Sequence, residues 1–153
     1  MSFNFSGMIL AAGFGKRLMP LTKNIPKPLI DINGITLLDN SINFLKTLGC
    51  KDIIINTHYR HDKIENFINQ RKDKKIIKLI YENEILDTGG GIKNAISSFL
   101  YKDILVMNSD IFWIKKNIND VNSLIHRYVN NKFAHLLLVK KNKSFGLDKT
   151  SGD

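Results

Sequence analysis

The chain has 153 residues, of which 43% are hydrophobic and 24% are charged, with a net charge of +9. These values predict one globular domain with a single core and exclude a disordered or collagen-like chain. The one cysteine, Cys50, excludes an internal disulfide or a Cys-based zinc site, and favours a reducing compartment. Because the N-terminus lacks a signal-peptide pattern and no stretch approaches the roughly 18 apolar residues of a membrane span, we expect a soluble, cytoplasmic protein without a membrane partner.

Apolar runs typical of strands alternate along the chain with patterns typical of helices. Leu38, Ile42 and Leu45 recur at helical spacing. Ile53-Ile54-Ile55 is a β-branched run typical of a buried parallel strand. The expected strands are residues 8–10, 52–57, 76–81, 103–108 and 133–139, and the expected helices are residues 36–48, one capped by Asp62, residues 89–100 and one capped by Asn119 or Asp120.

Strands separated by helices predict right-handed β-α-β crossovers and a mostly parallel α/β sheet with helices on both faces. Ligands of such sheets usually bind beyond the carboxyl ends of the strands, near the point where the strand order reverses. Three loops leave those ends here, at residues 11–27, 82–91 and 108–113. We therefore expect the functional residues in these loops.

The first of these loops combines small residues with positive charge. Gly13 and Gly15 directly follow a predicted strand, where small residues let backbone N–H groups approach a phosphate. Lys16, Arg17 and Lys27 add cations. The loop is neither a dinucleotide-binding fingerprint nor a Walker loop, because a leucine stands at the third glycine position and no Gly-Lys-Ser/Thr follows. On these residues alone, a phosphate site and a glycine-rich turn with solvated cations both stay open.

The other two loops place polar residues at the same edge of the predicted sheet. Thr88 and three glycines open a predicted helix, and a helix N-terminus favours anionic or acceptor groups; a flexible turn is the alternative. Asp110 follows a buried strand after Asn108 and Ser109. Mg²⁺ is often held by one or two carboxylates together with substrate phosphates, so Asp110 is a candidate magnesium ligand; a turn cap is the alternative.

The longer string identifies a family. Ala-Ala-Gly-x-Gly-x-Arg-Leu-x-Pro-Leu-Thr, followed by Pro-Lys-Pro-Leu, resembles the sugar-1-phosphate nucleotidyltransferase family over about twenty positions. Leu-x-Thr-Gly-Gly-Gly-Ile is similar to the branch of N-acetylmuramate-1-phosphate uridylyltransferase and mannose-1-phosphate guanylyltransferase. The resemblance implies a Rossmann-like three-layer sandwich of the nucleotide-diphospho-sugar transferase type, and an enzyme that uses Mg²⁺, a nucleoside triphosphate and a sugar-1-phosphate.

The resemblance also implies a role for individual residues. Arg17 and Lys27 would hold the reacting phosphates, and Asp110 would hold the metal, with Ser109 standing where the family usually has glycine. Gly152 and Asp153 would lie near the sugar. The implied nucleotide-binding residues are Leu10, Ala11, Ala12, Gly13, Gly15, Lys16, Arg17, Lys27, Thr88, Gly89 and Asn108.

The implied substrates are UTP and N-acetylmuramate-1-phosphate or another hexose-1-phosphate, within cell-wall nucleotide-sugar synthesis. GTP with mannose-1-phosphate and dTTP with glucose-1-phosphate are the alternatives. Relatives of this domain extend further, so we expect residues 1–153 to be a nucleotidyltransferase domain that lacks its C-terminal part and binds nucleotide weakly. The oligomeric state is left without a prediction.

Two other classes of function compete with this interpretation. A noncatalytic nucleotide-binding module would keep the glycines and Thr88 but would release no pyrophosphate. A nucleic-acid binder would need a contiguous basic face. The densest cationic cluster, at Arg71, Lys72, Lys74 and Lys75, has no interleaved aromatic residues. The positive charge is 19 Lys against 4 Arg, spread along the chain, and it accompanies 22 Ile and 17 Asn. AT-rich codons explain this bias, so no nucleic-acid partner is expected.

Overall fold

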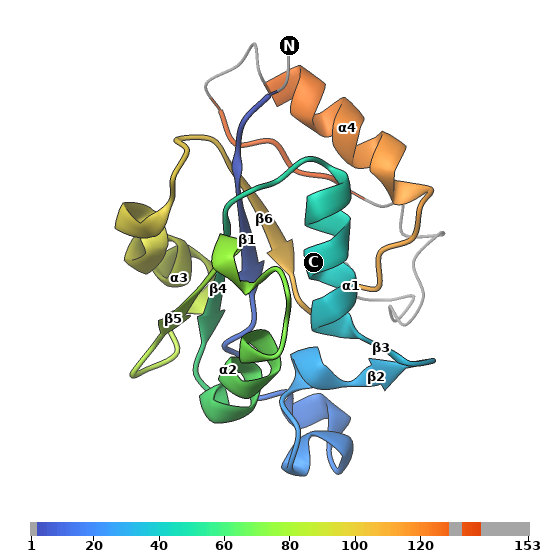
Figure 1. The fold of residues 1–153 in the computed structure, drawn as a ribbon. Helices are drawn as coiled ribbons and strands as arrows, with labels where there is room; N and C mark the ends of the chain where they lie inside the picture. The colour runs from blue at the N-terminus through green and yellow to red at the C-terminus, as the bar shows by residue number, and fades with distance from the viewer. Residues whose placement is uncertain (1–2, 129–132, 139–153) are drawn as a thin grey trace, which may run out of the picture. The chain divides into compact units, whose positions relative to one another are not determined.

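The computed structural model describes residues 3–128 and 133–138 (Figure 1). The chain forms two compact units, the first ending at Trp113 and the second beginning at Ile114. The first unit contains the sheet. The second contains α4, Asn117–Tyr128. Within the described residues, no helix is both long and apolar enough to cross a membrane.

A four-stranded parallel sheet forms the centre of the first unit, with the strand order β5-β4-β1-β6 (Figure 1). In the ladder, Leu10 of β1 lies opposite both Asn56 of β4 and Asn108 of β6, so the strands end at about the same level. This confirms the predicted parallel α/β sheet. The strands are β1 (Ser6–Leu10), β4 (Ile53–Thr57), β5 (Ile77–Tyr81) and β6 (Ile104–Asn108).

Helices cover both faces of the sheet. The chain moves from β1 through β4 to β5 in one direction and then returns across β1 to β6. Because β-α-β crossovers are right-handed, the first two helices lie on one face and the third on the other. The helices are α1 (Leu37–Thr47), α2 (His61–Asn69) and α3 (Asp87–Ala95), and a 3₁₀ turn at Ile96–Ser98 follows α3.

The strand residues alternate between these two helical layers. Met8 and Ile54 are fully buried and pack with Ala95 of α3. Gly7, one residue earlier in β1, faces α1, because a Cβ there would lie 2.7 Å from Leu45 Cδ1. Both faces of the central strands are therefore apolar, which is why Ile53-Ile54-Ile55 reads as a continuous run rather than an alternating one.

Helix starts differ from the sequence prediction in three places. α3 was expected over residues 89–100 but begins two residues earlier, at Asp87, and ends at Ala95. α2 begins at His61, with Arg60 at the cap in a left-handed conformation (φ 53°), so Asp62 lies in the first turn instead of capping the helix. α4 begins at Asn117, which places Asn119 and Asp120 inside it. The competing residues are all polar or acidic, and acidic groups stabilise a first helical turn as well as a cap, so the sequence did not discriminate among them.

The last predicted strand is wrong for the part that the structure describes. Residues 133–138 form no strand, and Phe133, Leu136 and Leu138 are 75%, 76% and 81% exposed. Val139 lies outside the described residues. An apolar run forms a strand only where a neighbouring strand supplies hydrogen-bond partners.

A small hairpin in the long first connection was not predicted. β2 (Asp31–Ile32) and β3 (Ile35–Thr36) pair antiparallel. The turn residues Asn33 and Gly34 both have positive φ, at 54° and 83°, as a type I′ hairpin turn requires. Thr36 then caps α1, because its side chain accepts a hydrogen bond from Asp39 N at 3.0 Å. The hairpin thus delivers the chain directly into α1.

Candidate active site

A cavity of about 450 Å³ opens at the carboxyl ends of β1 and β6. These are the two strands between which the chain order reverses, the place where ligands bind in open α/β sheets. The first and third predicted loops both line it. The predicted site residues that line this cavity are Leu10, Ala11, Gly13, Gly15, Lys16, Arg17, Lys27, Asn108 and Asp110.

A second cavity of about 190 Å³ shares Leu10, Gly13 and Asn108 with the first. Ala12 and Thr88 also line it, so the second predicted loop reaches the same region. Gly89 lines neither cavity. The two cavities together give a long site with one strongly basic half.

Gly15 shapes the first loop. It has φ +65°, a conformation that side chains disfavour, and a Cβ there would lie 3.0 Å from Thr22 Cγ2 and 3.2 Å from Lys27 Cβ. The buried Thr22 hydroxyl donates to the Gly15 carbonyl at 2.9 Å. Gly13 differs, because a Cβ there would meet no atom within 4 Å. Gly15 is therefore required by the fold, whereas the open side of Gly13 is free for a ligand.

Lys27 connects the first loop to the third. It begins a 3₁₀ turn between Pro26 and Pro28, both buried, and the prolines restrict its backbone. Lys27 Nζ lies 2.6 Å from Asp110 Oδ2, and the two side chains are 31% and 40% exposed. The residue predicted to hold phosphates thus lies against the residue predicted to hold the metal.

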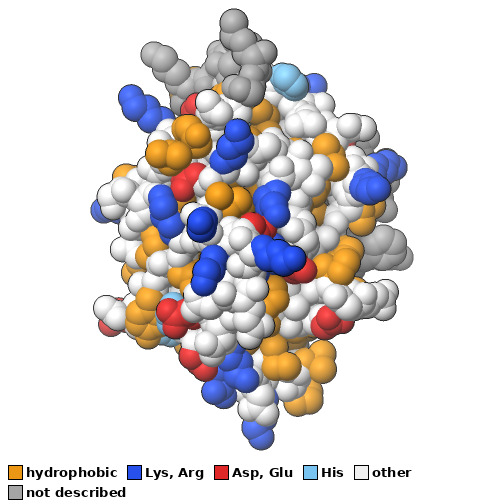
Figure 2. All heavy atoms as spheres, in the orientation of Figure 1, with side chains coloured by type: hydrophobic (Ala, Val, Ile, Leu, Met, Phe, Trp, Pro, Cys, Tyr) orange, Lys and Arg blue, Asp and Glu red, His pale blue; other side chains and the backbone are white. Residues whose placement is uncertain are grey.

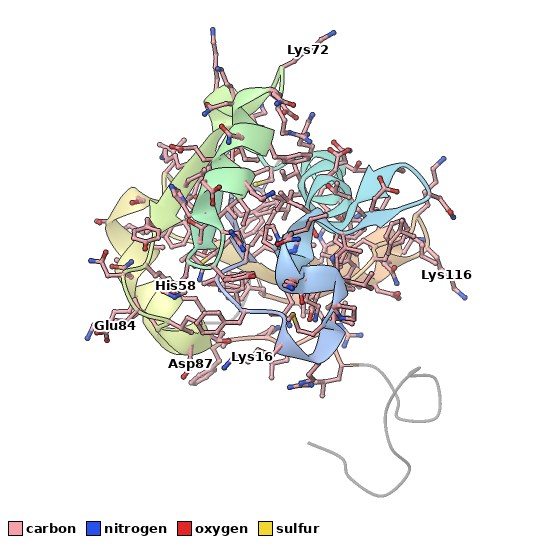
Figure 3. The ribbon with its side chains drawn as sticks, turned by 90° about the horizontal axis from the view of Figure 1, so that it is seen from below. Lys16, His58, Lys72, Glu84, Asp87 and Lys116 are labelled. Carbon is pink, nitrogen blue, oxygen red and sulfur yellow. The ribbon has the colours of Figure 1, made fainter. Side chains whose placement is uncertain are left out.

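Lys16 and Arg17 supply the remaining charge of the basic half. Both are exposed, both belong to a 3₁₀ turn at Lys16–Leu18, and Lys16 Nζ lies 5.1 Å from the centre of the Phe14 ring. Figure 3 shows the molecule from below, toward the carboxyl ends of the strands. In this view Lys16 lies on the same side as Asp87 and on the opposite side from Lys72. As expected from their place outside the apolar pattern, none of the cavity cations belongs to the core.

The carboxylate of Asp110 has the chemistry of a magnesium ligand. Among the described residues it is the one carboxylate that lines the larger cavity, it is exposed, and its Oδ2 accepts a hydrogen bond from a cation, Lys27 Nζ. Ser109 is buried, and its backbone N–H donates to the Leu10 carbonyl at 3.2 Å, which fixes the third loop beside β1. No group of three or more His, Cys, Asp or Glu side chains gathers in a metal-binding arrangement among the described residues.

Four residues of the second cavity were not predicted as site residues, namely Asn56, Glu82, Ile85 and Asp87. Asn56 and Glu82 are 3% and 2% exposed, although both are polar. The sequence did carry a signal, because Asn56 ends a β-branched run and Glu82 directly follows a strand. Both are the polar positions that a buried parallel strand presents at its carboxyl end.

The two residues predicted near the sugar, Gly152 and Asp153, lie outside the described residues.

The charged side chains of one face of the molecule are drawn in Figure 2. Figure 2 shows lysine and arginine side chains across this face, with acidic and hydrophobic side chains among them.

Comparison with known proteins agrees with this geometry. Residues 6–150 match the nucleotidyl transferase family. The chain belongs to this family. The predicted resemblance is thereby confirmed, and so is the fold that it implied.

Relatives of this chain are named for the transfer of different nucleotides. The chain is 34% identical over 112 residues to N-acetylmuramate alpha-1-phosphate uridylyltransferase of Caulobacter vibrioides, covering 71% of this chain and 46% of the relative. It is 29% identical over 138 residues to D-glycero-alpha-D-manno-heptose 1-phosphate guanylyltransferase of Aneurinibacillus thermoaerophilus, covering 90% and 58%. The chain therefore spans about half the length of these relatives.

Solved structures show the same fold. HddC from Yersinia pseudotuberculosis complexed with GMP-PN superposes with a TM-score of 0.61 and 32% identity, covering 76% of this chain and 53% of that protein. UDP-glucose pyrophosphorylase complexed with UDP-glucose superposes with a TM-score of 0.70 over 83% of this chain and 55% of that protein. At 19% identity, the second comparison concerns the fold alone.

Proposed function

We propose that this chain binds a nucleoside triphosphate and acts in nucleotidyl transfer to a sugar-1-phosphate, with release of pyrophosphate. The observation that carries the proposal is the arrangement of Lys16, Arg17 and Lys27 around one cavity at the strand-order reversal, beside Asp110. Three cations in a shared cavity complement the negative charge of a triphosphate, and backbone groups next to Gly13 can approach it closely. Membership of the nucleotidyl transferase family supports the same conclusion.

In this proposal the chain contributes positioning and charge. The phosphates lie in the larger cavity against Arg17 and Lys27, and the nucleoside extends into the smaller cavity toward Thr88. A sugar-phosphate oxygen attacks the α-phosphorus, the bond between the α- and β-phosphates breaks, and pyrophosphate leaves. Fixed cations stabilise charge on the phosphates without the cost of solvent reorganisation. Mg²⁺, held by Asp110, would neutralise part of the phosphate charge.

We infer UTP and N-acetylmuramate-1-phosphate, or another hexose-1-phosphate, as the preferred substrates, in a cytoplasmic pathway of cell-wall nucleotide sugars. Similarity to the Caulobacter vibrioides uridylyltransferase supports this choice. Guanylyl transfer to mannose-1-phosphate is the second candidate, supported by 37% identity over 110 residues to mannose-1-phosphate guanyltransferase of Hypocrea jecorina. Thymidylyl transfer to glucose-1-phosphate is a third alternative.

The test begins with binding. Calorimetry with four nucleoside triphosphates should show one preferred base, and pyrophosphate release against a panel of sugar-1-phosphates should then identify the acceptor. Arg17→Ala should weaken triphosphate binding roughly 10²-fold, as expected for loss of a fixed charge contact. Arg127→Ala, which removes an exposed arginine of α4 that lines neither cavity, is the matched control. Equal losses in both variants would contradict the site.

The metal is tested separately. Asp110→Asn should abolish the gain in triphosphate affinity that Mg²⁺ gives the wild type, while the metal-independent affinity for the nucleoside remains. An identical response of wild type and variant to Mg²⁺ would make Asp110 a structural residue and refute the metal role.

A further inference from the structure

A buried chain of hydrogen bonds joins the two loops that line the cavities. Asn56 Oδ1 accepts from the Ala11 backbone N–H at 2.9 Å, and Asn56 Nδ2 donates to Glu82 Oε1 at 2.8 Å. Glu82 Oε2 accepts from the Leu86 backbone N–H at 3.3 Å. Ala11 belongs to the glycine-rich loop, and Leu86 directly precedes α3 and its three glycines. Two side chains thus connect the basic half of the site with the half that contains Thr88.

The chemistry of the end groups fixes the direction of every bond in this chain. A backbone N–H can only donate, so Asn56 must present its oxygen to Ala11 and its amide nitrogen to Glu82. Glu82 then accepts with both carboxyl oxygens. Because both side chains are almost fully buried, a lost partner leaves a buried polar group unsatisfied, and each bond is costly to break.

The Asn56–Glu82 pair is closely packed on several sides. A Cβ on Gly91 of α3 would lie 2.9 Å from both Asn56 Nδ2 and Glu82 Oε1, so the helix packs directly on the pair. The Glu82 backbone is also held on both sides: its N–H donates to the Thr57 carbonyl at 2.8 Å, and His58 Nδ1 lies 2.7 Å from its carbonyl oxygen. The pair is therefore held by the helix that packs on it and by the backbone bonds of Glu82.

We propose that Asn56 and Glu82 are positioning residues that set the separation between the phosphate-binding loop and the nucleoside-binding helix start. This inference rests on the proposed function of the cavities. A ligand that spans both cavities, such as a nucleoside triphosphate, depends on that separation, whereas a ligand of the basic half alone does not. Because each side chain accepts from the backbone N–H of a different site loop, the placement of the pair between these loops points to a functional role.

Reciprocal exchange of the two side-chain types tests this inference. Glu82→Gln places an amide nitrogen against another donor, and Asn56→Asp places two acceptor oxygens against each other. The double variant Asn56→Asp with Glu82→Gln restores complementarity, because the new amide donates to the new carboxylate and both backbone N–H groups keep an oxygen acceptor. Shape and net charge match the wild type. Asp52→Asn, which alters a buried carboxylate at the opposite end of the sheet, is the control for a purely structural defect.

The first measurement compares nucleoside triphosphates with inorganic triphosphate by calorimetry, at a temperature where every variant is folded. Each single variant should lose about tenfold or more in nucleoside triphosphate affinity, with less than about a threefold change for inorganic triphosphate, and the double variant should recover most of the loss. Asp52→Asn should lower the melting temperature and leave the ratio of the two affinities unchanged. An unchanged ratio in the single variants, or no recovery in the double variant, would overturn the inference.

The second measurement needs no ligand and separates the inference from the proposed function. Amide hydrogen exchange in Glu82→Gln should accelerate about tenfold at Ala11, which Glu82 does not contact, and the double variant should restore slow exchange. If the wild type binds no triphosphate, the proposed function fails while this result still supports the coupling of the two loops. Acceleration at Leu86 alone, with Ala11 unchanged, would refute the coupling.

Discussion

A buried carboxyl group stands at each end of the parallel sheet, and the two are used differently. At the amino ends, Asp52 accepts from the Ser6 hydroxyl at 2.6 Å and from Leu100 N at 2.8 Å, and it lies 3.1 Å from Lys78 Nζ. At the carboxyl ends, Glu82 accepts from Asn56 and from Leu86 N. Each carboxyl group therefore ties a strand to a connecting segment with the same kinds of bond.

The difference lies in what these carboxyl groups hold. The residues bonded to Asp52 line neither cavity. They lie at the amino ends of the strands, where Ser6 begins β1 and Leu100 precedes β6. Glu82 bonds to Leu86 directly and reaches Ala11 through Asn56. The two loops that contain Ala11 and Leu86 have other residues that line the cavities. A buried carboxylate is thus a general means of fixing loop ends in this fold, and function depends on which loops it fixes. Variants of Asp52 should therefore change mainly the free energy of unfolding, whereas variants of Glu82 should change mainly nucleotide binding.

The largest effect should come from removing a cavity cation. Lys27 and Lys46 each form an ion pair, with Asp110 and Asp73 respectively, and their side chains are 31% and 40% exposed. Lys27→Ala should weaken triphosphate binding roughly 10²-fold, because a positioned charge is lost. Lys46→Ala should leave binding unchanged. Both melting temperatures should move little, since exposed ion pairs contribute only about 0–1 kcal/mol. A large stability loss with normal binding in Lys27→Ala would reverse the assignment.

A second comparison concerns stability at the closed end. Asp52→Ala leaves the buried Ser6 hydroxyl and the Leu100 N–H without their acceptor, so the free energy of unfolding should fall by about 2 kcal/mol. Denaturant unfolding measures this loss. Calorimetry on the folded variant should give wild-type triphosphate affinity, because no bonded partner of Asp52 lines a cavity. Weakened binding of the folded protein would show that the two ends of the sheet are coupled.

A third comparison separates the two glycines of the first loop. Gly15→Ala puts a side chain at φ +65° and 3.0 Å from Thr22, so the free energy of unfolding should fall by about 1.5 kcal/mol. Gly13→Ala meets open space and should unfold like the wild type. Gly13 lines both cavities, so its methyl group should instead weaken triphosphate binding. Thermal denaturation should show the loss of stability in Gly15→Ala, and calorimetry should show the weaker triphosphate binding in Gly13→Ala.

The sequence predicted most of the residues that line the larger cavity, because they lie in contiguous motifs. The glycine-rich loop, Lys27 and Asp110 all follow strands that are recognisable from β-branched or apolar runs, and parallel topology brings such loops together. Asn56 and Glu82 escaped because each stands alone in the sequence, 26 residues apart, and becomes significant only through the contact between β4 and the end of β5.

Boundaries were less predictable than elements, for a related reason. Helix starts at Arg60–His61 and at Asn117 depend on which of several polar residues adopts the cap conformation, and the run at 133–138 depends on a partner strand. The hairpin turn at Asn33-Gly34 is the exception, because Asn-Gly is a specific local signal for a type I′ turn and was available in the sequence.

The smallest effect should be an acid-dependent one, at an ion-paired carboxylate that lines neither cavity. Hydrogen bonds from Arg71 lower the pKa of Asp73 to about 2; burial opposes this shift and Lys46 adds to it. Because the folded pKa lies below the ordinary value of 3.8, the stabilisation is complete above about pH 4 and is lost as the pH falls toward 2. Asp73→Asn should therefore be less stable than the wild type by about 1 kcal/mol or less at neutral pH, and the difference should shrink between pH 4 and pH 2. Denaturant unfolding across this range measures the difference, and triphosphate affinity at neutral pH should be unchanged. A difference that stays constant down to pH 2 would show that the Asp73 carboxylate contributes through packing rather than through its charge.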